Sequence, residues 1–470
     1  MNTRFRPMWG LLLAMTLLAA ACSGSAVESG EEEPVAPADD APADDAAVDD
    51  APEETSEEED PADAATEPAD SAATDSPAPS EPAGGDAEPS GTITVGLINP
   101  ITGPFAALGE DTNAGFELYV EEQGGQLSGY DVVVESEDTG NDAAIATDGV
   151  ERLLNADADV LVGFVNSGVA YGASEVIRES GVPLIITTAG ADNLTQRDAA
   201  DNIFRVSYTS SQDAMPLGDY ACNELGYENV AVVGLDYAFG WEAAGGFSKA
   251  FTDAGCTVVQ ELYAPLGTQD WAPFVQQIDR DADAVWAVIA GSDAIRFARS
   301  YSDFGVGLPL LGHGSLTDEQ VLAEQAQTAE GAVTTLHYSG VIDSEDNATF
   351  VEAFEAASGR SVSQYAEHGY AAAQVIEAAL AEIDEVSSDA LNQALLNVQI
   401  DAPRGPLSFD EFGQAVYTVY VREVAQDEEG NWVNSVIDEI PDVSQFWTYD
   451  PEEFMAEEPL ADRRGTWATG

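Results

Sequence analysis

The sequence predicts an α/β protein built from two doubly wound lobes, each with a parallel sheet. Short apolar runs typical of buried strands alternate with helix-like segments from Thr92 onward. This alternation is typical of a parallel sheet covered by helices. A second set of such units begins after Ser207. Two sets exceed what one hydrophobic core usually holds, so we expect two lobes.

The chain begins with features of an export signal. Two arginines precede an apolar run from Trp9 to Ala21, which is too short to span a bilayer as a helix. Cys22 follows directly, as in a bacterial lipoprotein cleavage box, although Ala19 stands where that box more often has Leu. We expect a lipoprotein signal peptide over residues 1–21 and lipidation of Cys22, which would anchor the protein to the outer face of the cytoplasmic membrane. Ordinary secretory cleavage is the alternative.

Residues 22–91 are predicted to form a disordered acidic tether. Between Ala26 and Gly91 there are 23 acidic residues and no Lys or Arg. Such a segment cannot bury enough apolar surface to offset its chain entropy. Charge repulsion would extend it and hold the folded part away from the membrane.

The rest of the chain is also acidic. The whole sequence has 15 basic and 87 acidic residues, and Lys249 is its only lysine. Binding to nucleic acid or to anionic lipid needs clustered cations, so we expect neither as a partner.

The first set of elements runs from Ile93 to the helix after Ile186. Its expected strands are Ile93–Ile98, Val132–Glu135, Val160–Val162 and Leu184–Ile186. Its first two expected helices are Ala106–Glu122 and Asp142–Asn155.

The second set has the same alternation. Its expected helices are Asp213–Leu225 and Glu242–Ala254, and its expected strands are Val230–Leu235, Thr257–Leu262, Ala284–Ile289 and Leu308–Leu311. A long apolar helix, Tyr370–Ile383, is expected to return to the first lobe. Two late strands, Tyr417–Val424 and Val433–Ile440, are expected in the second lobe.

Two loops are the first candidates for a binding site. Val162–Ala173 and Val182–Leu194 each start as an apolar strand and then turn into small and polar residues. Ligands of open α/β sheets bind at the carboxyl ends of the strands, where helix-start N–H groups can receive a carboxylate. Ordinary strand-to-helix loops have a similar composition, which leaves that interpretation open.

Several short motifs in a fixed order resemble one family. They are Val95-Gly96-Leu97-Ile98, Thr102-Gly103-Pro104, the two loops, Asp236-Tyr237-Ala238-Phe239-Gly240, Gly369-Tyr370-Ala371-Ala372 and Gly405-Pro406-Leu407-Ser408-Phe409-Asp410. From Thr92 to about Ile440 the chain resembles a type I periplasmic solute-binding protein of ABC transporters. The similarity is to the branch that binds branched-chain amino acids (Leu/Ile/Val) and amides.

The resemblance implies how the two lobes are divided. Lobe 1 would comprise residues 92–207 with about 338–415, and lobe 2 residues 208–337 with about 416–440. Residues 441–470 are expected to form a C-terminal tail, for which the resemblance gives no counterpart. The chain would cross between the lobes three times, near Tyr208, His337 and Ala415, and these crossings would form a hinge.

Binding residues follow from the same resemblance. Ser167 matches the serine that holds a ligand carboxylate or amide. Ala189 matches a position whose carbonyl takes the ligand amino group, and Ala191 one that supplies an N–H. In lobe 2, Phe239 matches an aromatic residue that closes on the ligand. Three further positions complete this set: Leu108 in a side-chain pocket, and Gly291 and Ser292 where lobe 2 reaches the ligand.

One position departs from the family pattern. Amino-acid binders of this branch have a glutamate near His313, which pairs with the ligand ammonium; this chain has the histidine instead. Asp236 or Glu367 could supply the charge. Because Phe239 and Leu108 could also be plain core residues, the site depends on the resemblance.

We find no sequence motif for catalysis or metal binding. The chain lacks G-x-S-x-G, a phosphate loop and H-E-x-x-H, and its three histidines are far apart in sequence. We therefore expect no enzyme activity, no cofactor and no metal. Cys222 and Cys256 fall at the same end of adjacent elements, which favours a disulfide in an exported chain over two free thiols.

These observations favour an exported, lipid-anchored and monomeric receptor. It would capture a small neutral or zwitterionic solute, foremost a branched-chain or related amino acid, and deliver it to ABC-transporter permease subunits. The alternatives are a ligand-sensing domain of the same fold, or a binder of a short amide or aromatic acid.

Overall fold

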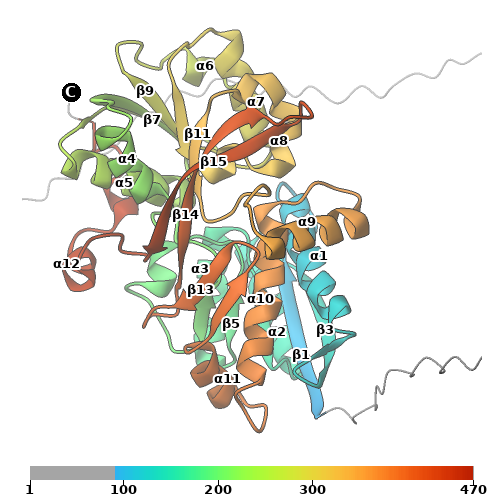
Figure 1. The fold of residues 1–470 in the computed structure, drawn as a ribbon. Helices are drawn as coiled ribbons and strands as arrows, with labels where there is room; N and C mark the ends of the chain where they lie inside the picture. The colour runs from blue at the N-terminus through green and yellow to red at the C-terminus, as the bar shows by residue number, and fades with distance from the viewer. Residues whose placement is uncertain (1–89, 469–470) are drawn as a thin grey trace, which may run out of the picture. The chain divides into compact units, whose positions relative to one another are not determined.

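The structure, a computed structural model, describes residues 90–468 and contains two sheets that form two lobes (Figure 1). The predicted signal peptide, the lipidated Cys22 and nearly all of the acidic tether lie outside the described residues. Within the described part, no helix combines the length and apolarity needed to cross a membrane.

Lobe 1 surrounds a six-stranded sheet. Its strand order is β2-β3-β1-β4-β5-β6, and all neighbours are parallel except β2 and β3. The strands are β1 (Gly91–Asn99), β2 (Gln126–Leu127), β3 (Tyr130–Asp138), β4 (Val160–Gly163), β5 (Leu184–Ile186) and β6 (Ile203–Arg205). The central strands are apolar on both faces because helices cover both faces of the sheet.

The helices of lobe 1 come from two parts of the chain. They are α1 (Ala106–Glu122), α2 (Ala143–Asn155), α3 (Ser167–Ser180), η1 (Asp192–Thr195), α9 (Glu345–Ser358), α10 (Gln364–Leu380) and α11 (Ser388–Leu395). Helices α1 and α10 pack closely, and glycine is needed where they cross. A Cβ atom on Gly115 or Gly369 would lie 1.9 Å from a carbonyl oxygen of the other helix. This close packing holds the start of α10 beside the loops at the edge of the sheet.

Lobe 2 surrounds five parallel strands, to which four antiparallel strands are added. The parallel strands are β7 (Asn229–Leu235), β8 (Thr257–Ala264), β9 (Ala284–Val288), β10 (Leu310–His313) and β11 (Val333–Leu336). The others are β12 (Gln399–Ala402), β13 (Gly405–Phe409), β14 (Ala415–Gln426) and β15 (Trp432–Val443). Strand β12 packs against α10 of lobe 1, so this end of the sheet contacts both lobes.

The helices of lobe 2 are short except for α5. They are α4 (Ala214–Asn223), α5 (Ala238–Asp253), α6 (Ala272–Val275), α7 (Ser292–Asp303), η2 (Gly314–Leu316), α8 (Glu319–Gln325) and η3 (Ala326–Ala329). Two predicted helix starts are too late in the sequence. Helix α5 begins at Ala238 rather than Glu242, and α10 begins at Gln364 rather than Tyr370. In α10 the hydroxyl of Ser363 accepts the N–H of Ala366, which caps a first turn whose buried polar residues hid it from hydrophobicity patterns.

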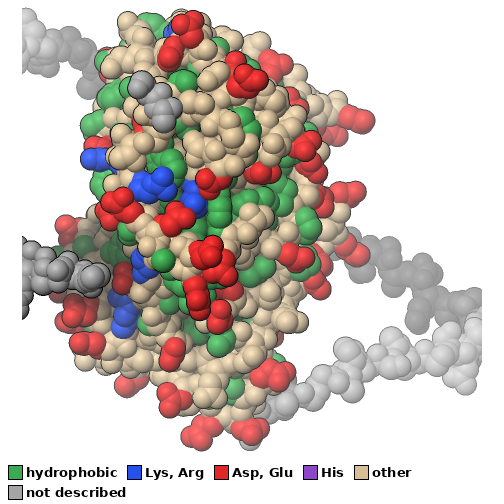
Figure 2. Space-filling model, turned by 90° about the vertical axis from the view of Figure 1, so that its left-hand side faces the viewer, with side chains coloured by type: hydrophobic (Ala, Val, Ile, Leu, Met, Phe, Trp, Pro, Cys, Tyr) green, Lys and Arg blue, Asp and Glu red, His purple; other side chains and the backbone are tan. Residues whose placement is uncertain are grey.

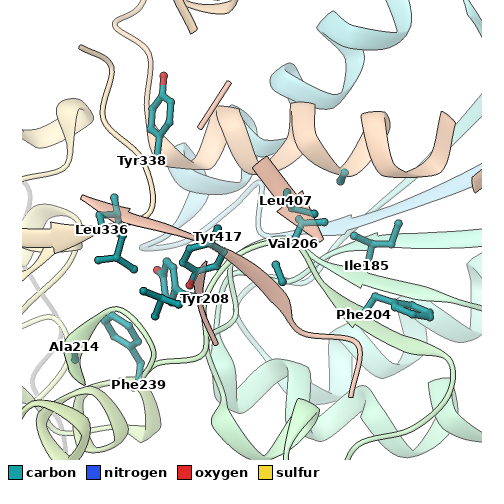
Figure 3. Packing of buried hydrophobic residues seen from close by; sticks show 14 of the residues in the cluster. Ile185, Phe204, Val206, Tyr208, Ala214, Phe239, Leu336, Tyr338, Leu407 and Tyr417 are labelled. Carbon is teal, nitrogen blue, oxygen red and sulfur yellow. The ribbon is translucent and has the colours of Figure 1, made fainter. Parts of the chain in front are cut away.

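Two of the predicted crossing positions, Tyr208 and His337, lie side by side, and they lie next to Tyr417, two residues after the third position, Ala415. The ring centroid of His337 is 5.5 Å from that of Tyr208 and 5.0 Å from that of Tyr417. Figure 3 shows Tyr208 between Tyr417 and Phe239, in a hydrophobic cluster whose members come from both lobes. One cluster therefore packs across the region where the chain passes from lobe to lobe.

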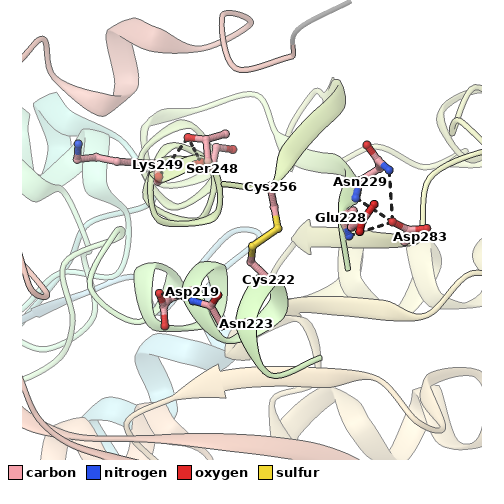
Figure 4. Close-up of a disulfide and its surroundings, with 10 residues drawn as sticks. Asp219, Cys222, Asn223, Glu228, Asn229, Ser248, Lys249, Cys256 and Asp283 are labelled. Atoms are coloured by element: carbon pink, nitrogen blue, oxygen red, sulfur yellow. Dashed lines mark hydrogen bonds between the residues drawn. A yellow bond between two sulfur atoms is a disulfide. The ribbon is translucent and has the colours of Figure 1, made fainter. Parts of the chain in front are cut away.

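Cys222 and Cys256 form a disulfide in lobe 2 (Figure 4). Cys222 lies in the last turn of α4 and Cys256 directly precedes β8, with 6.0 Å between their Cα atoms. The bond joins the end of helix α4 to the start of the edge strand β8, which is the opposite end of that strand from the carboxyl edge of the sheet.

The C-terminal segment, which resembled nothing in the sequence, packs on lobe 2. It contains α12 (Pro451–Ala456) and η4 (Leu460–Arg463), and η4 contacts α5. The side chains of Phe446, Phe454 and Trp467 are buried. This segment therefore contributes to the core of the domain.

Acidic side chains outnumber basic ones on the surface seen in Figure 2. Figure 2 shows them spread over one face, with only a few Lys and Arg side chains among them. This distribution agrees with the excess of acidic residues in the sequence.

Candidate functional site

A small cavity lies where loops of both lobes meet. Its volume is about 20 Å³. It is lined by Phe105, Leu108, Val165, Ser167, Thr188, Gly190, Tyr208, Tyr237, Phe239, Ala290 and Tyr365. Lobe 1 contributes through the loops after β4 and β5 and through α1 and α10, and lobe 2 through the loops after β7 and β9. This is the carboxyl edge of both parallel sheets, the place where such sheets bind ligands.

The loop after β4 places Ser167 at the first position of α3. The side chain of Asn166 accepts the N–H groups of Gly168 (2.8 Å) and Val169 (3.4 Å), which caps the helix. First-turn N–H groups of a helix have no partner within the helix, and the helix dipole favours negative charge there. Ser167 is therefore well placed to receive an anionic group.

The loop after β5 is tied to its neighbours through Phe164. This residue has a left-handed backbone conformation (φ 68°), which costs a non-glycine residue of order 1–3 kcal/mol. Its carbonyl oxygen accepts the N–H groups of Thr188 (3.2 Å) and Ala189 (2.8 Å). The strained residue thus joins the two loops that line the cavity from lobe 1.

Thr188 and Gly190 line the cavity, whereas Ala189 and Ala191 do not. The two alanines are fully buried in the core of lobe 1. Gly190 touches the first crossing segment: its carbonyl accepts the N–H of Ser210 at 2.6 Å, and a Cβ atom would lie 2.8 Å from the Ser210 hydroxyl. The main-chain contacts predicted for Ala189 and Ala191 stay predictions, and Thr188 and Gly190 add lining residues that were not predicted.

Lobe 2 forms an aromatic wall. Phe239 is in the first turn of α5, and its ring centroid lies 6.0 Å from that of Tyr237, 6.1 Å from that of Tyr208 and 5.0 Å from that of His313. Ala290 completes the wall, while its neighbours Gly291 and Ser292 are outside the lining and Ser292 is exposed.

His313 lies behind the aromatic wall and carries no charge. Its Nδ1 accepts the N–H of Ser315 at 3.1 Å, and burial, with the nearby Arg422, lowers its pKa to about 3. Neither proposed substitute for the missing acid faces the cavity. Asp236 pairs with Arg464 and accepts the indole N–H of Trp241, and Glu367 forms a buried ion pair with Arg404.

The three histidines, which are far apart in the sequence, meet in space. All three rings contact Tyr208, with centroid distances of 4.9 Å for His313, 5.5 Å for His337 and 6.0 Å for His368. Their separation in the sequence therefore does not show that they are separated in space. The contact arises because β10, β11 and α10 all end or begin at the same edge.

His337, His368 and Glu367 could in principle hold a metal ion. The donor geometry fits poorly. The Nε2 atoms of the two histidines are 2.9 Å apart, whereas tetrahedral zinc would separate two imidazole nitrogens by roughly 3.3 Å. Both carboxylate oxygens of Glu367 accept hydrogen bonds from Arg404. The group is instead a hydrogen-bonded cluster.

Larger hollows lie elsewhere on lobe 1. One of about 570 Å³ includes Arg197 and Phe412, and one of about 820 Å³ is lined largely by the ends of α10 and α11. Neither includes the strand ends where the two lobes meet. We place the candidate site at the smaller cavity because both sheets direct their loops to it.

A family model described as periplasmic binding protein matches residues 92–430. The chain belongs to this family. Periplasmic binding proteins bind solutes outside the cytoplasm and are not a family of enzymes.

Relatives of this binding protein cover most of its length. It is 30% identical over 364 residues to Leu/Ile/Val-binding protein homolog 6 of Brucella melitensis, which covers 73% of this chain and 90% of the relative. An ABC transporter substrate-binding protein from Sphaerobacter thermophilus is 32% identical, with a TM-score of 0.72 over 75% of this chain and 99% of that one. A solute-binding protein of an ABC transporter from R. palustris, in complex with benzoate, is 33% identical, with a TM-score of 0.70 over 75% and 98%.

Three of the predicted site residues of the binding protein line the cavity. These are Ser167, Leu108 and Phe239. The lining residues that were not predicted are Phe105, Val165, Thr188, Gly190, Tyr208, Tyr237, Ala290 and Tyr365. Tyr237 lies within a motif already recognised, and Thr188 and Gly190 lie within a recognised loop. The chain brings Tyr365 to the cavity only through the packing of α10 on α1.

Proposed function

We propose that this binding protein captures a small neutral or zwitterionic solute between its lobes and delivers it to an ABC-transporter permease. The observation that carries the proposal is the convergence of polar strand-end groups from lobe 1 and aromatic rings from lobe 2 on one cavity. Capture between two lobes uses contacts that one lobe alone cannot make, so binding favours the closed arrangement.

The solute would place a carboxylate at the start of α3. Ser167 offers a hydroxyl and an N–H there, and Thr188 and Gly190 add polar groups from the next loop. No Arg or Lys is among the described lining residues, which disfavours a multiply charged anion. Leu108 and Phe239 would cover an apolar side chain.

Two solute classes carry one carboxylate and an apolar body: a zwitterionic amino acid and, as the alternative, an aromatic acid, which is a monoanion at neutral pH. A branched-chain or related amino acid is supported by the similarity to the Leu/Ile/Val-binding protein homolog. An aromatic acid is supported by the aromatic side chains of the lining and by the R. palustris relative that holds benzoate. A thermal-shift screen with both classes separates them. A solute at 100 times its Kd should stabilise the protein by about 2.7 kcal/mol. If no member of either class raises the melting temperature, the proposed solute chemistry is wrong.

Entry of either solute requires movement. A cavity of about 20 Å³ has room for roughly one water molecule. We infer that the lobes part about the crossings near Tyr208, His337 and Ala415, and close again on the solute. Small-angle scattering should show compaction when a saturating solute is added. An unchanged profile with a confirmed tight solute would count against this movement.

We further propose that the protein is a monomer attached to the membrane by a lipid on Cys22, with the acidic segment up to residue 91 as a tether. The support is the order of the export-signal features in the sequence. The Cys22→Ala variant should be released from membranes or remain an uncleaved precursor. A processed variant that stays on the membrane would refute the anchor.

A further inference from the structure

Four buried side chains connect the cavity to lobe 2 through a chain of hydrogen bonds. Asp213 Oδ2 lies 3.0 Å from His337 Nδ1, His337 Nε2 lies 2.9 Å from His368 Nε2, and His368 Nδ1 lies 3.0 Å from Thr188 Oγ1. None of the four is more than 5% exposed. We call these four residues the relay. It begins just before α4 and ends at the cavity wall.

Because its two imidazole rings are neutral, the hydrogen bonds of the relay can be donated in only two ways, all toward Asp213 or all toward Thr188. A neutral imidazole has one N–H donor and one acceptor nitrogen. At the contact between the two Nε2 atoms one nitrogen must carry the proton and the other must not. Each choice fixes the proton on every other ring nitrogen, and therefore fixes which way the Thr188 hydroxyl points.

Asp213 decides between the two directions. Its Oδ1 accepts the hydroxyl of Tyr417 at 2.9 Å. When Asp213 is ionised it can only accept, so His337 donates from Nδ1, His368 donates from Nε2, and Thr188 donates to His368. The lone pairs of Thr188 Oγ1 are then left for the solute. When Asp213 is protonated, every bond reverses and Thr188 donates into the cavity.

The surroundings of the relay keep its rings neutral and place the titration on Asp213. Burial raises the pKa of Asp213 to about 7, while Tyr417, His337 and the charges of Arg404 and Arg422 act to lower it. Burial and the nearby Arg404 lower the pKa of both His337 and His368 well below the usual range. The other groups that face the relay are Tyr208, Tyr365, the neutral His313, and Glu367, which is paired with Arg404.

We propose that Asp213, His337 and His368 are positioning residues that make Thr188 a hydrogen-bond acceptor, so that the site selects solutes with an N–H or O–H donor at that point, such as an ammonium group. This inference rests on the proposed function. It also identifies the negative charge that would interact with a ligand ammonium, since no Asp or Glu is among the described residues that line the cavity. The charge is on Asp213 and acts through two neutral rings.

Reversal of the relay balances one proton. A proton taken up at Thr188 Oγ1 from the cavity passes the threonine proton to His368 Nδ1, the His368 Nε2 proton to His337 Nε2, and the His337 Nδ1 proton to Asp213 Oδ2. The rings stay neutral, and Asp213 gains the proton. Selection of donor solutes should therefore be complete well above pH 7 and be lost below it.

The tautomers can be read directly, because the whole chain has only three histidines. In protein labelled with ¹⁵N-histidine at pH 8, we expect His337 protonated on Nδ1, His368 on Nε2, and a scalar coupling across the Nε2–Nε2 hydrogen bond. His313 is an internal reference, protonated on Nε2 because its Nδ1 accepts Ser315. The Thr188→Val variant tells which signals belong to His337 and which to His368, because it should shift only the Nδ1 signal of His368. The opposite tautomers at pH 8 would overturn the inference.

Solute selection supplies the second readout. 4-Methyl-2-oxopentanoate has a carbonyl group where L-leucine has its ammonium group. Calorimetry at pH 8 measures the Kd of each solute. Thr188→Val should weaken leucine binding by about 10- to 150-fold and leave the oxo acid nearly unchanged. An equal loss for both solutes would overturn the inference. If neither binds, 4-hydroxybenzoate and benzoate are the second matched pair. If all four fail to bind, the comparison moves to the tightest solute of the thermal-shift screen and its analogue without the donor, and the tautomers decide independently whether the relay has the stated direction.

A pH profile separates positioning from a merely structural role. Leucine preference should fall between pH 8 and pH 6 in the wild type. Tyr417→Phe removes a donor that stabilises the Asp213 carboxylate, so the midpoint should move to higher pH. Asp213→Asn should abolish the pH dependence; the tyrosine variant keeps the test valid if the asparagine variant does not fold. A midpoint unmoved by Tyr417→Phe would contradict the proposed role of Asp213.

Discussion

The two lobes present different chemistry to the same cavity. Lobe 1 offers the polar groups of Ser167, Thr188 and Gly190 at strand ends together with apolar side chains such as Leu108, whereas lobe 2 offers only Tyr237, Phe239 and Ala290 among the described lining residues. Behind the polar wall lie buried charges and histidines; behind the aromatic wall lies a neutral, buried imidazole. The difference suggests a division of labour. Lobe 1 would orient the polar end of a solute, and the aromatic wall of lobe 2 would cover its apolar body together with Leu108 of lobe 1.

The largest effect should come from the charge pair behind the polar wall. Arg404 and Glu367 are both fully buried, and Arg404 also donates to the carbonyl of Val206 at 2.6 Å. Arg404→Met leaves a buried carboxylate without its partner and should lower the free energy of unfolding by about 3–5 kcal/mol. Urea unfolding measures this loss in the free energy of unfolding. The double variant Arg404→Met with Glu367→Met removes both charges and should recover much of the loss; additive losses would refute this account.

The disulfide should matter to lobe 2 alone. It closes a separation of 34 residues, and Cys222→Ser with Cys256→Ser should cost about 2–4 kcal/mol through a less constrained unfolded chain. Hydrogen exchange should increase in α4 and β8, and solute affinity should stay at the wild-type value. A large loss of affinity would mean that the disulfide also affects the solute site, contrary to this expectation.

Removing the hydroxyl of Ser167 should weaken binding without destabilising the fold. The loss of a hydrogen bond to a charged group predicts about 1–3 kcal/mol in calorimetry, or about 5- to 150-fold in Kd. Ser292→Ala is the matched control, because Ser292 also begins a helix but is exposed and outside the lining. Equal effects of the two substitutions would show that the site has been misplaced.

A smaller effect should follow from changing the aromatic wall. Phe239→Leu keeps an apolar cover but removes a ring that contacts Tyr208 and His313, and aromatic pairs contribute about 0.5–1.5 kcal/mol beyond buried area. The loss should be greater for an aromatic acid than for leucine. Comparing the two solutes by calorimetry tests this, and the same loss for both would remove the ring-specific role of Phe239.

The sequence predicted the alternating strands and helices well, because buried parallel strands and amphipathic helices leave clear patterns. Of the polar residues that line the cavity from lobe 1, Ser167 was predicted, whereas Thr188 and Gly190 were not. The resemblance selected the carbonyl of Ala189 and the N–H of Ala191, and these main-chain contacts stay predictions; the side chains of both alanines lie in the core of lobe 1. An irregular loop has no periodicity from which to predict which of its groups face a ligand.

Contacts between distant segments were not predictable from local patterns. His337 and His368 meet because β11 and α10 converge, and Tyr365 reaches the cavity because α10 begins six residues earlier than its apolar run. Tertiary packing decides both. The relay to Asp213 therefore depends on tertiary packing, which local sequence patterns do not predict.

The most direct test is a crystal structure with the tightest-binding solute of the screen. The account predicts its carboxylate within hydrogen-bonding distance of Ser167 and the first N–H groups of α3, with its apolar body between Leu108 and Phe239. A solute bound instead in the hollow beside Arg197 and Phe412, on the outside of lobe 1, would contradict it.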